Sequence, residues 1–330
     1  LVGRWTLGHR FNVAFLLGLL IGIGFLTVKA YFKDREDEGY VAAVKQADLA
    51  AERVPELVEA YGIGFEGAAQ LVRDDPFLQG PRLFARHCAA CHRYNEHDGT
   101  GRELFEERDQ KKVKVEPTAA DLGNFGTKEW IVSLVSDYPM HFEALKNAAW
   151  YQELQREKQA QGEDFDKPFL DLDETEDTST MAGWTAQSRE ILNSPEGREA
   201  LEAVAAYIVA NSGRADLQVS DATLVERGAE LFDSADWPGG ELADGISCSG
   251  CHTLEAGKPG PEPDEDGSGI PILTGYGGRR WLEHFISDPA KHYGEKNQMP
   301  AYNDRLSDKD LQLLTRWMSG EYHPTKVSRK

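Results

Sequence analysis

The longest apolar run of the chain lies near its N-terminus. Residues 11–28 carry no charge, and the run reaches Phe32 if the Lys29 side chain extends to the membrane surface. This length predicts one helix that spans a bilayer, within residues 1–32. A cleavable signal peptide is the alternative, but Lys29-Ala30-Tyr31-Phe32 offers no small-residue cleavage site.

The rest of the chain has helical patterning, which predicts an all-α fold. Residues 33–75 are charged and helix-forming, and we expect them to form a helical linker. Breaks in this linker are expected at Pro55, Gly62, Gly64 and Pro76. Amphipathic helices are predicted over residues 199–210 and 307–318.

A short cysteine motif occurs twice, as Cys88-Ala-Ala-Cys91-His92 and as Cys248-Ser-Gly-Cys251-His252. Two thiols on one helical turn match the two vinyl groups of a porphyrin, and the following histidine lies under the iron as an axial ligand. A redox motif would need a βαβ pattern, which is not visible, and a zinc site would need both boxes to converge. The two boxes use all four cysteines of the chain. We therefore predict two covalently bound haem c groups.

The two boxes belong to a longer internal repeat. Leu122, Phe125, Gly126, Trp130, Ser136-Asp137 and His141 recur as Leu273, Tyr276, Gly277, Trp281, Ser287-Asp288 and His292, always 151 residues later. Ahead of the boxes, Gly80 and Phe84 correspond to Gly228 and Phe232. A register of this length indicates tandem domains, which we place at residues 76–215 and 216–330.

Each repeat reaches a methionine followed by an aromatic residue, Met181-Ala-Gly-Trp184 and Met299-Pro-Ala-Tyr302. A thioether is a common sixth ligand of a c-type haem iron, so we predict Met181 for the first haem and Met299 for the second. Met140 follows a proline, but its repeat partner is Lys291, and Met318 lies on the last helix. We interpret Met140 and Met318 as core residues. Iron with both faces occupied favours electron transfer over substrate binding.

Three other pairs repeat without a ligand role. His141 and His292 are interpreted as local hydrogen-bonding residues or as propionate contacts. Trp130 and Trp281 are either propionate donors or core residues. We expect the first helix of each domain to cross its last helix at a glycine, so that Gly80 and Phe84 pack on Tyr207, and Gly228 and Phe232 pack on Trp317.

Charge and insertions bear on partners. The chain has 56 acidic and 36 basic residues and a net charge of −20, which argues against nucleic-acid binding. The first repeat has 33 more residues than the second between its histidine and its methionine, giving an insertion at 143–180. Glu143–Gln159 reads as a helix, and eight acids follow in Glu163–Asp177. That acidic stretch is either a docking surface for a basic partner or a solvated loop.

The boxes, the Gly/Phe helices and the Met299-Pro300 loop together resemble class I cytochromes c, twice over, across residues 76–325. Residues 273–282 (LTGYGGRRWL), followed by Ile-Ser-Asp-Pro and the Met-Pro-Ala-Tyr loop, resemble the c-type extension of bacterial cytochrome b/c proteins. The larger pattern is similar to membrane-anchored dihaem subunits of quinol-oxidising cytochrome bc complexes. Residues 8–13 are similar to the start of the last membrane helix of those cytochrome b/c proteins, which runs into their haem module. Met181 departs from the pattern because alanine follows it.

This resemblance implies an electron-transfer subunit without a catalytic substrate site of its own. Its partners would be the lipid bilayer, cytochrome b and Rieske-type subunits, and a soluble acceptor such as a cytochrome c or a copper protein. The haem domains would lie on the periplasmic side of the bacterial inner membrane, because haem is attached to such boxes outside the cytoplasm. Because the chain begins with Leu1, we expect a processed or longer product. A dihaem anchor subunit of a cbb3-type oxidase and a dihaem peroxidase-like enzyme are the alternatives.

Overall fold

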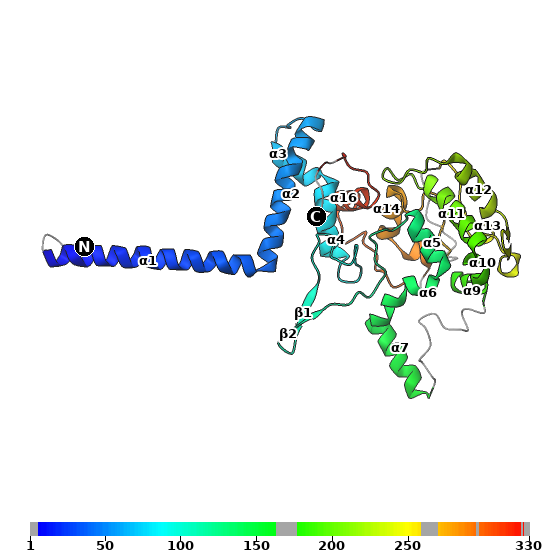
Figure 1. Cartoon of the computed structure of the whole chain (residues 1–330), viewed down its shortest axis with the longest axis horizontal. Helices are drawn as coiled ribbons and strands as arrows, with labels where there is room; N and C mark the ends of the chain where they lie inside the picture. The colour runs from blue at the N-terminus through cyan, green and yellow to red at the C-terminus, as the bar shows by residue number, and fades with distance from the viewer. Residues whose placement is uncertain (1–5, 163–176, 259–269, 295–296, 325, 327–330) are drawn as a thin grey trace. The chain divides into compact units, whose positions relative to one another are not determined.

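The computed structural model describes residues 6–162, 177–258, 270–294, 297–324 and 326 (Figure 1). Contacts divide the chain into two units, Leu1–Gly62 with Thr325–Lys330, and Ile63–Pro324. The acidic stretch 163–176 and the loop 259–269 lie outside the described residues.

Helix α1 (Thr6–Glu36) contains the predicted apolar run. Its Gly8–Glu36 segment has a window of mean hydropathy 2.3 that is not buried inside the protein. Large apolar side chains are exposed on it, among them Ile21 and Phe25 at 71% and 66%. The predicted helix is confirmed, and it is long and apolar enough to span a bilayer.

Helix α2 (Glu38–Tyr61) forms most of the linker. The Asp37 carboxylate caps its first turn by accepting the Tyr40 N–H at 3.0 Å. Gly62, in the left-handed region at φ 73°, ends it as expected. The break predicted at Pro55 is wrong, because α2 continues through that residue. A proline removes one hydrogen bond from the helix, and the turns on both sides remain intact.

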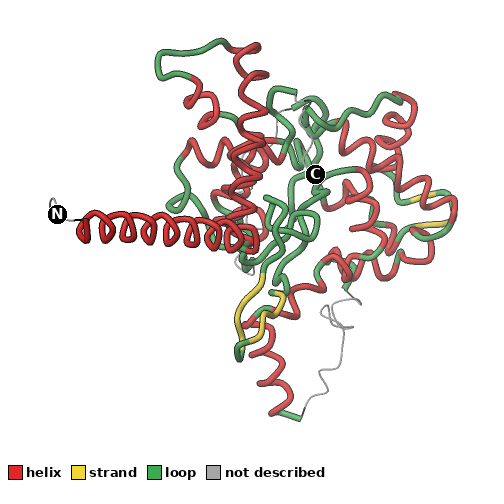
Figure 2. Tube along the Cα trace, turned by 60° about the vertical axis from the view of Figure 1, so that its left-hand side comes forward, coloured by secondary structure: helices red, strands yellow, loops and turns green. Residues whose placement is uncertain are grey.

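The second unit consists of helices and loops with two short hairpins (Figure 2). Its first part contains α3 (Ala68–Asp74), α4 (Pro76–His87), β1 (Phe105–Arg108), β2 (Lys111–Lys114), α5 (Lys128–Ser136), α6 (Tyr138–His141), the 3₁₀ helix η1 (Glu143–Asn147) and α7 (Ala149–Ala160). Its second part contains α9 (Met181–Gln187), α10 (Arg189–Leu192), α11 (Pro195–Ala210), α12 (Ala222–Phe232), β3 (Asp236–Trp237), β4 (Gly240–Glu241), η2 (Ala243–Gly245), α13 (Cys248–Cys251), α14 (Arg279–Ser287), α15 (Ala290–Tyr293) and α16 (Asp308–Met318).

The amphipathic helices predicted over residues 199–210 and 307–318 are confirmed as α11 and α16. Ser194 and Ser307 cap them, each accepting a backbone N–H three residues later. The helix expected over Glu143–Gln159 is present as η1 and α7, which are separated at Ala148.

The helices pair differently from the expectation. The aromatic ring of Phe84 on α4 contacts Trp317 on α16, with ring centroids 5.9 Å apart. A Cβ on Gly80 would lie 2.2 Å from the Cβ of Trp317, so α4 and α16 touch at this glycine. The predicted packing of Gly80 and Phe84 on Tyr207 is therefore wrong.

Helices α11 and α12 form the other contact, which joins the last helix of the first repeat to the first helix of the second. Phe232 contacts Tyr207 with centroids 5.7 Å apart, and a Cβ on Gly228 would lie 2.0 Å from the Ala203 carbonyl oxygen. The predicted packing of Gly228 on Trp317 is wrong for the same reason. Both last helices carry an aromatic residue and both first helices carry a glycine, so either first helix fits either last helix.

The two repeats cross each other at equivalent glycines. A Cβ on Gly126 would lie 3.6 Å from the Cα of Gly277, and a Cβ on Gly277 would lie 3.5 Å from the Cα of Gly126. Both glycines have positive φ, 73° and 72°. The rings of Phe125 and Tyr276, the residues before them, pack at a tilt with centroids 5.4 Å apart. Equivalent residues that meet in this way indicate a local two-fold relation between the repeats.

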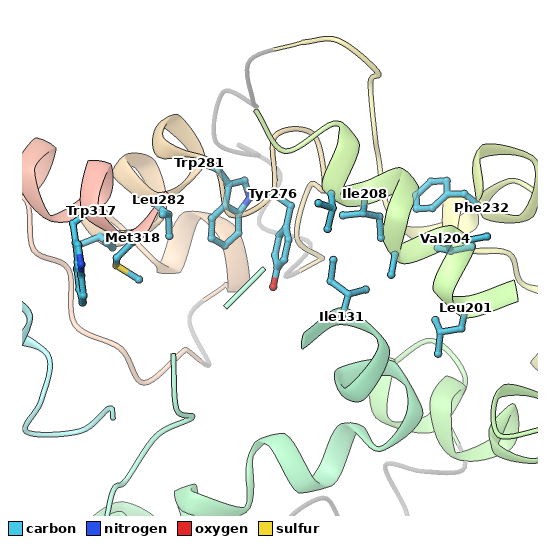
Figure 3. Packing of buried hydrophobic residues seen from close by; sticks show 14 of the residues in the cluster. Ile131, Leu201, Val204, Ile208, Phe232, Tyr276, Trp281, Leu282, Trp317 and Met318 are labelled. Carbon is cyan, nitrogen blue, oxygen red and sulfur yellow. The ribbon is translucent and has the colours of Figure 1, made fainter. Parts of the chain in front are cut away.

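One cluster of buried side chains runs through the second unit. It includes Leu201, Val204 and Phe232 at the α11/α12 end and Trp317 and Met318 at the α16 end (Figure 3). Met318 is 8% exposed, which confirms the interpretation of this methionine as a core residue. The side chain of Met140 lies outside the described part of the structure.

Candidate haem sites

The first cysteine box forms one helical turn at the end of α4. The Cys88 N–H donates to the Phe84 carbonyl at 2.8 Å, and the His92 N–H donates to the Cys88 carbonyl at 2.9 Å. Both thiols and the histidine are therefore held within one turn, as attachment to a single porphyrin requires.

The second box has the same local geometry. Cys248–Cys251 form α13, and the His252 N–H donates to the Cys248 carbonyl at 2.8 Å. The first box directly follows α4, but the second does not directly follow α12. Extra residues ahead of the second box form β3, β4 and η2.

Each box histidine is fixed by a backbone carbonyl. His92 Nδ1 donates to the Ala120 carbonyl at 2.8 Å, and His252 Nδ1 donates to the Pro271 carbonyl at 2.9 Å. A carbonyl only accepts, so the proton is on Nδ1 and the lone pair is on Nε2, the atom that binds iron. Burial lowers the pKa of both histidines and keeps the rings neutral. This donor arrangement fits an axial haem ligand.

The two thiols of each box differ in their environment. Burial raises the pKa of Cys88 and of Cys248 to about 12, so both are protonated in the free chain. Cys91 and Cys251 are exposed. Within the described ranges no three His, Cys, Asp or Glu side chains gather as a metal site would need.

The loop after the first box is organised by a buried cation that the sequence analysis did not identify. Arg93 is 4% exposed, and its guanidinium donates to the carbonyls of Ala89 and His92 at 2.8 and 2.9 Å and to that of Val115. It ties the box to residues more than twenty positions later. An arginine directly after a CxxCH box was the only signal.

An aspartate closes the same loop from the other side. The Asp121 carboxylate accepts the backbone N–H groups of Asn95 and Glu96 at 2.8 and 2.6 Å. Both residues have positive φ, 53° and 67°, so the carboxylate holds a turn that side chains disfavour. The sequence did not predict this contact, because Asp121 is far from Asn95 and Glu96 along the chain.

Met299 lies in the loop before α16, three residues before an aromatic residue that contacts the segment leading into the first box. Its carbonyl accepts the Asn297 amide at 2.8 Å, and its side chain is partly buried against the core. Three residues later, the Tyr302 hydroxyl donates to the His87 carbonyl, just ahead of Cys88, at 2.7 Å. Burial, and then the neighbouring Cys88 thiol, raise the pKa of Tyr302.

Met181 lies three residues before an aromatic residue that contacts the segment leading into the second box. It begins α9, which Thr180 caps by accepting the Gly183 N–H at 3.0 Å, and its side chain is partly buried against the core. Three residues later, the Trp184 indole donates to the Ile246 carbonyl, just ahead of Cys248, at 2.9 Å.

The repeated tryptophans differ in their hydrogen bonds. The Trp281 indole donates to the Ile272 carbonyl at 3.1 Å, so it has a partner within the chain. The buried Trp130 Nε1 has no partner of acceptable hydrogen-bond geometry among the described residues, although the Tyr276 hydroxyl is close. The fit to a haem rests instead on the two CxxCH turns and their carbonyl-anchored histidines, which are the donor set that a covalently bound haem needs.

The repeated histidines serve local structure. His141 pairs with the Ser133 hydroxyl at 2.8 Å and packs on Trp130, with ring centroids 4.9 Å apart. His292 is buried and packs on Trp281 at 5.5 Å. The local hydrogen bond predicted for His141 is confirmed.

A CxxCH turn with a carbonyl-anchored histidine supports a c-type cytochrome domain, and such a domain implies covalently bound haem c. Residues 227–318 match the family model described as "Cytochrome C oxidase, cbb3-type, subunit III". The match runs from α12 through the second box and Met299 to α16, less than a third of the chain. Comparisons with curated proteins and with solved structures gave no significant match.

Proposed function

We propose that the chain is a dihaem electron-transfer subunit with two tandem class I cytochrome c repeats, at residues 76–215 and 216–330. The observation that carries this proposal is the shared geometry of His92 and His252. Each follows a CxxCH turn, and each directs Nδ1 to a backbone carbonyl. Only the second box lies within the family match, so the first haem rests on this geometry and on the repeat.

The residues of the chain favour electron transfer over substrate chemistry. Each box histidine is held by a backbone carbonyl, and Met181 and Met299, the methionines predicted as sixth ligands, are partly buried against the core. A bound haem supplies the one-electron couple. A methionine sulfur raises its potential relative to a second histidine and closes the iron to small ligands.

A membrane complex is the proposed setting. Helix α1 is the candidate anchor. We propose that the second unit lies on the periplasmic side of a bacterial inner membrane, because haem is attached to such boxes outside the cytoplasm. We propose a cytochrome b and a Rieske-type subunit as membrane partners, with electrons passing to a soluble cytochrome c or copper protein. The resemblance of residues 273–282 to cytochrome b/c extensions supports this choice.

An oxidase is the second candidate. The matched family is described as a cbb3-type oxidase subunit, and its match supports a dihaem subunit of such an oxidase equally well. Purification of the complex from its native membrane, followed by identification of the co-purifying subunits by mass spectrometry, distinguishes the two. A b-type cytochrome with a Rieske protein supports the first, and a copper–haem oxidase core supports the second.

The haem content tests the function itself. The pyridine haemochrome spectrum of the full chain should give two c-type haems per polypeptide, and the reduced protein should bind no CO rapidly. Fewer than two haems would refute the dihaem proposal. Rapid CO binding at one haem would favour a peroxidase-like enzyme with an open iron.

A further inference from the structure

Trp184 and Tyr302 follow Met181 and Met299 by three residues, so their contacts indicate which box each methionine is closer to. In sequence order, Trp184 should contact the first box and Tyr302 the second. The structure shows the reverse, since Tyr302 donates to His87 ahead of the first box and Trp184 donates to Ile246 ahead of the second.

Contacts around the second box agree with this exchange. The Ser188 hydroxyl, from the first repeat, accepts the Ala243 N–H at 3.0 Å. The Thr178 hydroxyl donates to the Asp244 carboxylate at 2.6 Å. These two hydrogen bonds join the segment around Met181 to the turn that precedes Cys248.

Contacts around the first box show the same exchange from the other side. The Lys309 ammonium on α16 pairs with the Asp74 carboxylate at the end of α3, just before α4. Together with the α4/α16 contact at Gly80 and Trp317, this pair joins the end of the second repeat to the start of the first.

We propose that the two repeats exchange their methionines. The iron of the haem on Cys88 and Cys91 takes His92 and Met299, and the iron of the haem on Cys248 and Cys251 takes His252 and Met181. This assignment rests on the proposed function, in which both boxes carry haem. It differs from the order of the family match, in which the second box and Met299 belong to one domain.

Cross-linking in the full chain tests the exchange without reference to the iron. All four native cysteines are in the boxes, so thioether bonds consume them and only engineered thiols react with a short bis-maleimide. Asp74→Cys with Lys309→Cys should give a cross-link within one chain. The matched control is Ala222→Cys with Lys309→Cys, because exposed Ala222 stands in the second repeat where Asp74 stands in the first.

The expected result is an intrachain 74–309 peptide pair by mass spectrometry and loss of the 222–309 pair. The reverse yields would show that the helices pair in sequence order and would overturn the exchange. A 74–309 link found only between two chains would overturn it as well, because the partner helix would then come from a second copy.

Ligand substitution tests the sulfur assignment directly. A full chain with Cys248→Ser and Cys251→Ser retains only the first haem. In its ferric spectrum, the weak red-end charge-transfer band of a methionine-ligated haem should be lost with Met299→Ala and retained with Met181→Ala. Any other pattern refutes the assignment.

The two proposals fail separately. Two haems per chain with sequence-order cross-links would overturn the exchange and leave the electron-transfer function standing. Fewer than two haems would overturn the dihaem function, whatever the cross-links show.

Discussion

Gly228 is the position where the packing of α11 on α12 is easiest to test. A methyl group there would lie 2.0 Å from the Ala203 carbonyl oxygen and 2.8 Å from the Cβ of Tyr207. Comfortable contacts between non-bonded heavy atoms need about 3.5 Å, so Gly228→Ala must push the two helices apart by roughly 1.5 Å. Neither obstructing atom is the end of a flexible side chain, and the contact cannot be relieved by a rotamer change.

The expected cost follows from two opposing terms. Overpacking of a core contact costs about 1–3 kcal/mol, while alanine stabilises a helix by about 1 kcal/mol relative to glycine. Because the obstruction is rigid, we take the upper end and expect a net loss of about 2 kcal/mol. For a unit of this size, each kcal/mol lowers the melting midpoint by roughly 2–4 °C, so the shift is roughly 4–8 °C downward.

The assay is thermal unfolding of the full haem-loaded chain, followed by circular dichroism at one fixed scan rate. Gly22→Ala is the matched control, because a methyl group on Gly22 in α1 meets nothing within 4 Å. An unchanged or raised midpoint for Gly228→Ala would show that α11 and α12 are not in contact at this glycine, and the helix pairing described above would then be wrong.

Two further predictions use the aromatic contacts. In a double-mutant cycle, Phe232→Leu and Tyr207→Leu should couple by about 1 kcal/mol in unfolding free energy, as a packed aromatic pair does. Phe232→Leu and Trp317→Leu should be additive, and strong coupling in that second cycle would restore the sequence-order pairing. Trp184→Phe and Tyr302→Phe each remove one donor to a backbone carbonyl, so each should lower stability by about 1 kcal/mol without loss of haem, measured as melting midpoint and haemochrome content.

The sequence was sufficient for features that depend on local patterns. The apolar run of α1, the capped helices α11 and α16, and the turn geometry of both boxes follow from periodicity and spacing alone. The anchoring of His92 and the closure by Asp121 could not be predicted, because both contacts span more than twenty residues within a loop. The β1–β2 hairpin was also not predicted, because its strands are rich in charged residues, are exposed, and show no buried/exposed alternation.

The exchange of helices could not be predicted for a different reason. The repeats are alike at the contact positions, so α4 and α12 present the same Gly/Phe surface, and α11 and α16 present the same kind of aromatic. Contact energies therefore barely distinguish the two pairings. A repeat found in sequence predicts which surfaces fit each other, but it does not predict which copy supplies each surface.

The connections between elements decide the pairing where contacts do not. Residues 211–221 connect α11 to α12, so contact between these two helices closes only a short loop. Pairing in sequence order would instead require α11 to pack on α4, which lies more than a hundred residues earlier. Closing that longer loop costs more conformational entropy before any contact between the two helices forms. Once α11 and α12 are paired, α4 and α16 can pair only with each other. The connecting segments of the two repeats must then cross. The crossing occurs at Gly126 and Gly277, where positive φ and the absence of a side chain let the backbones pass within contact distance. Each candidate haem site is then built from both repeats, so neither site is complete in one repeat alone.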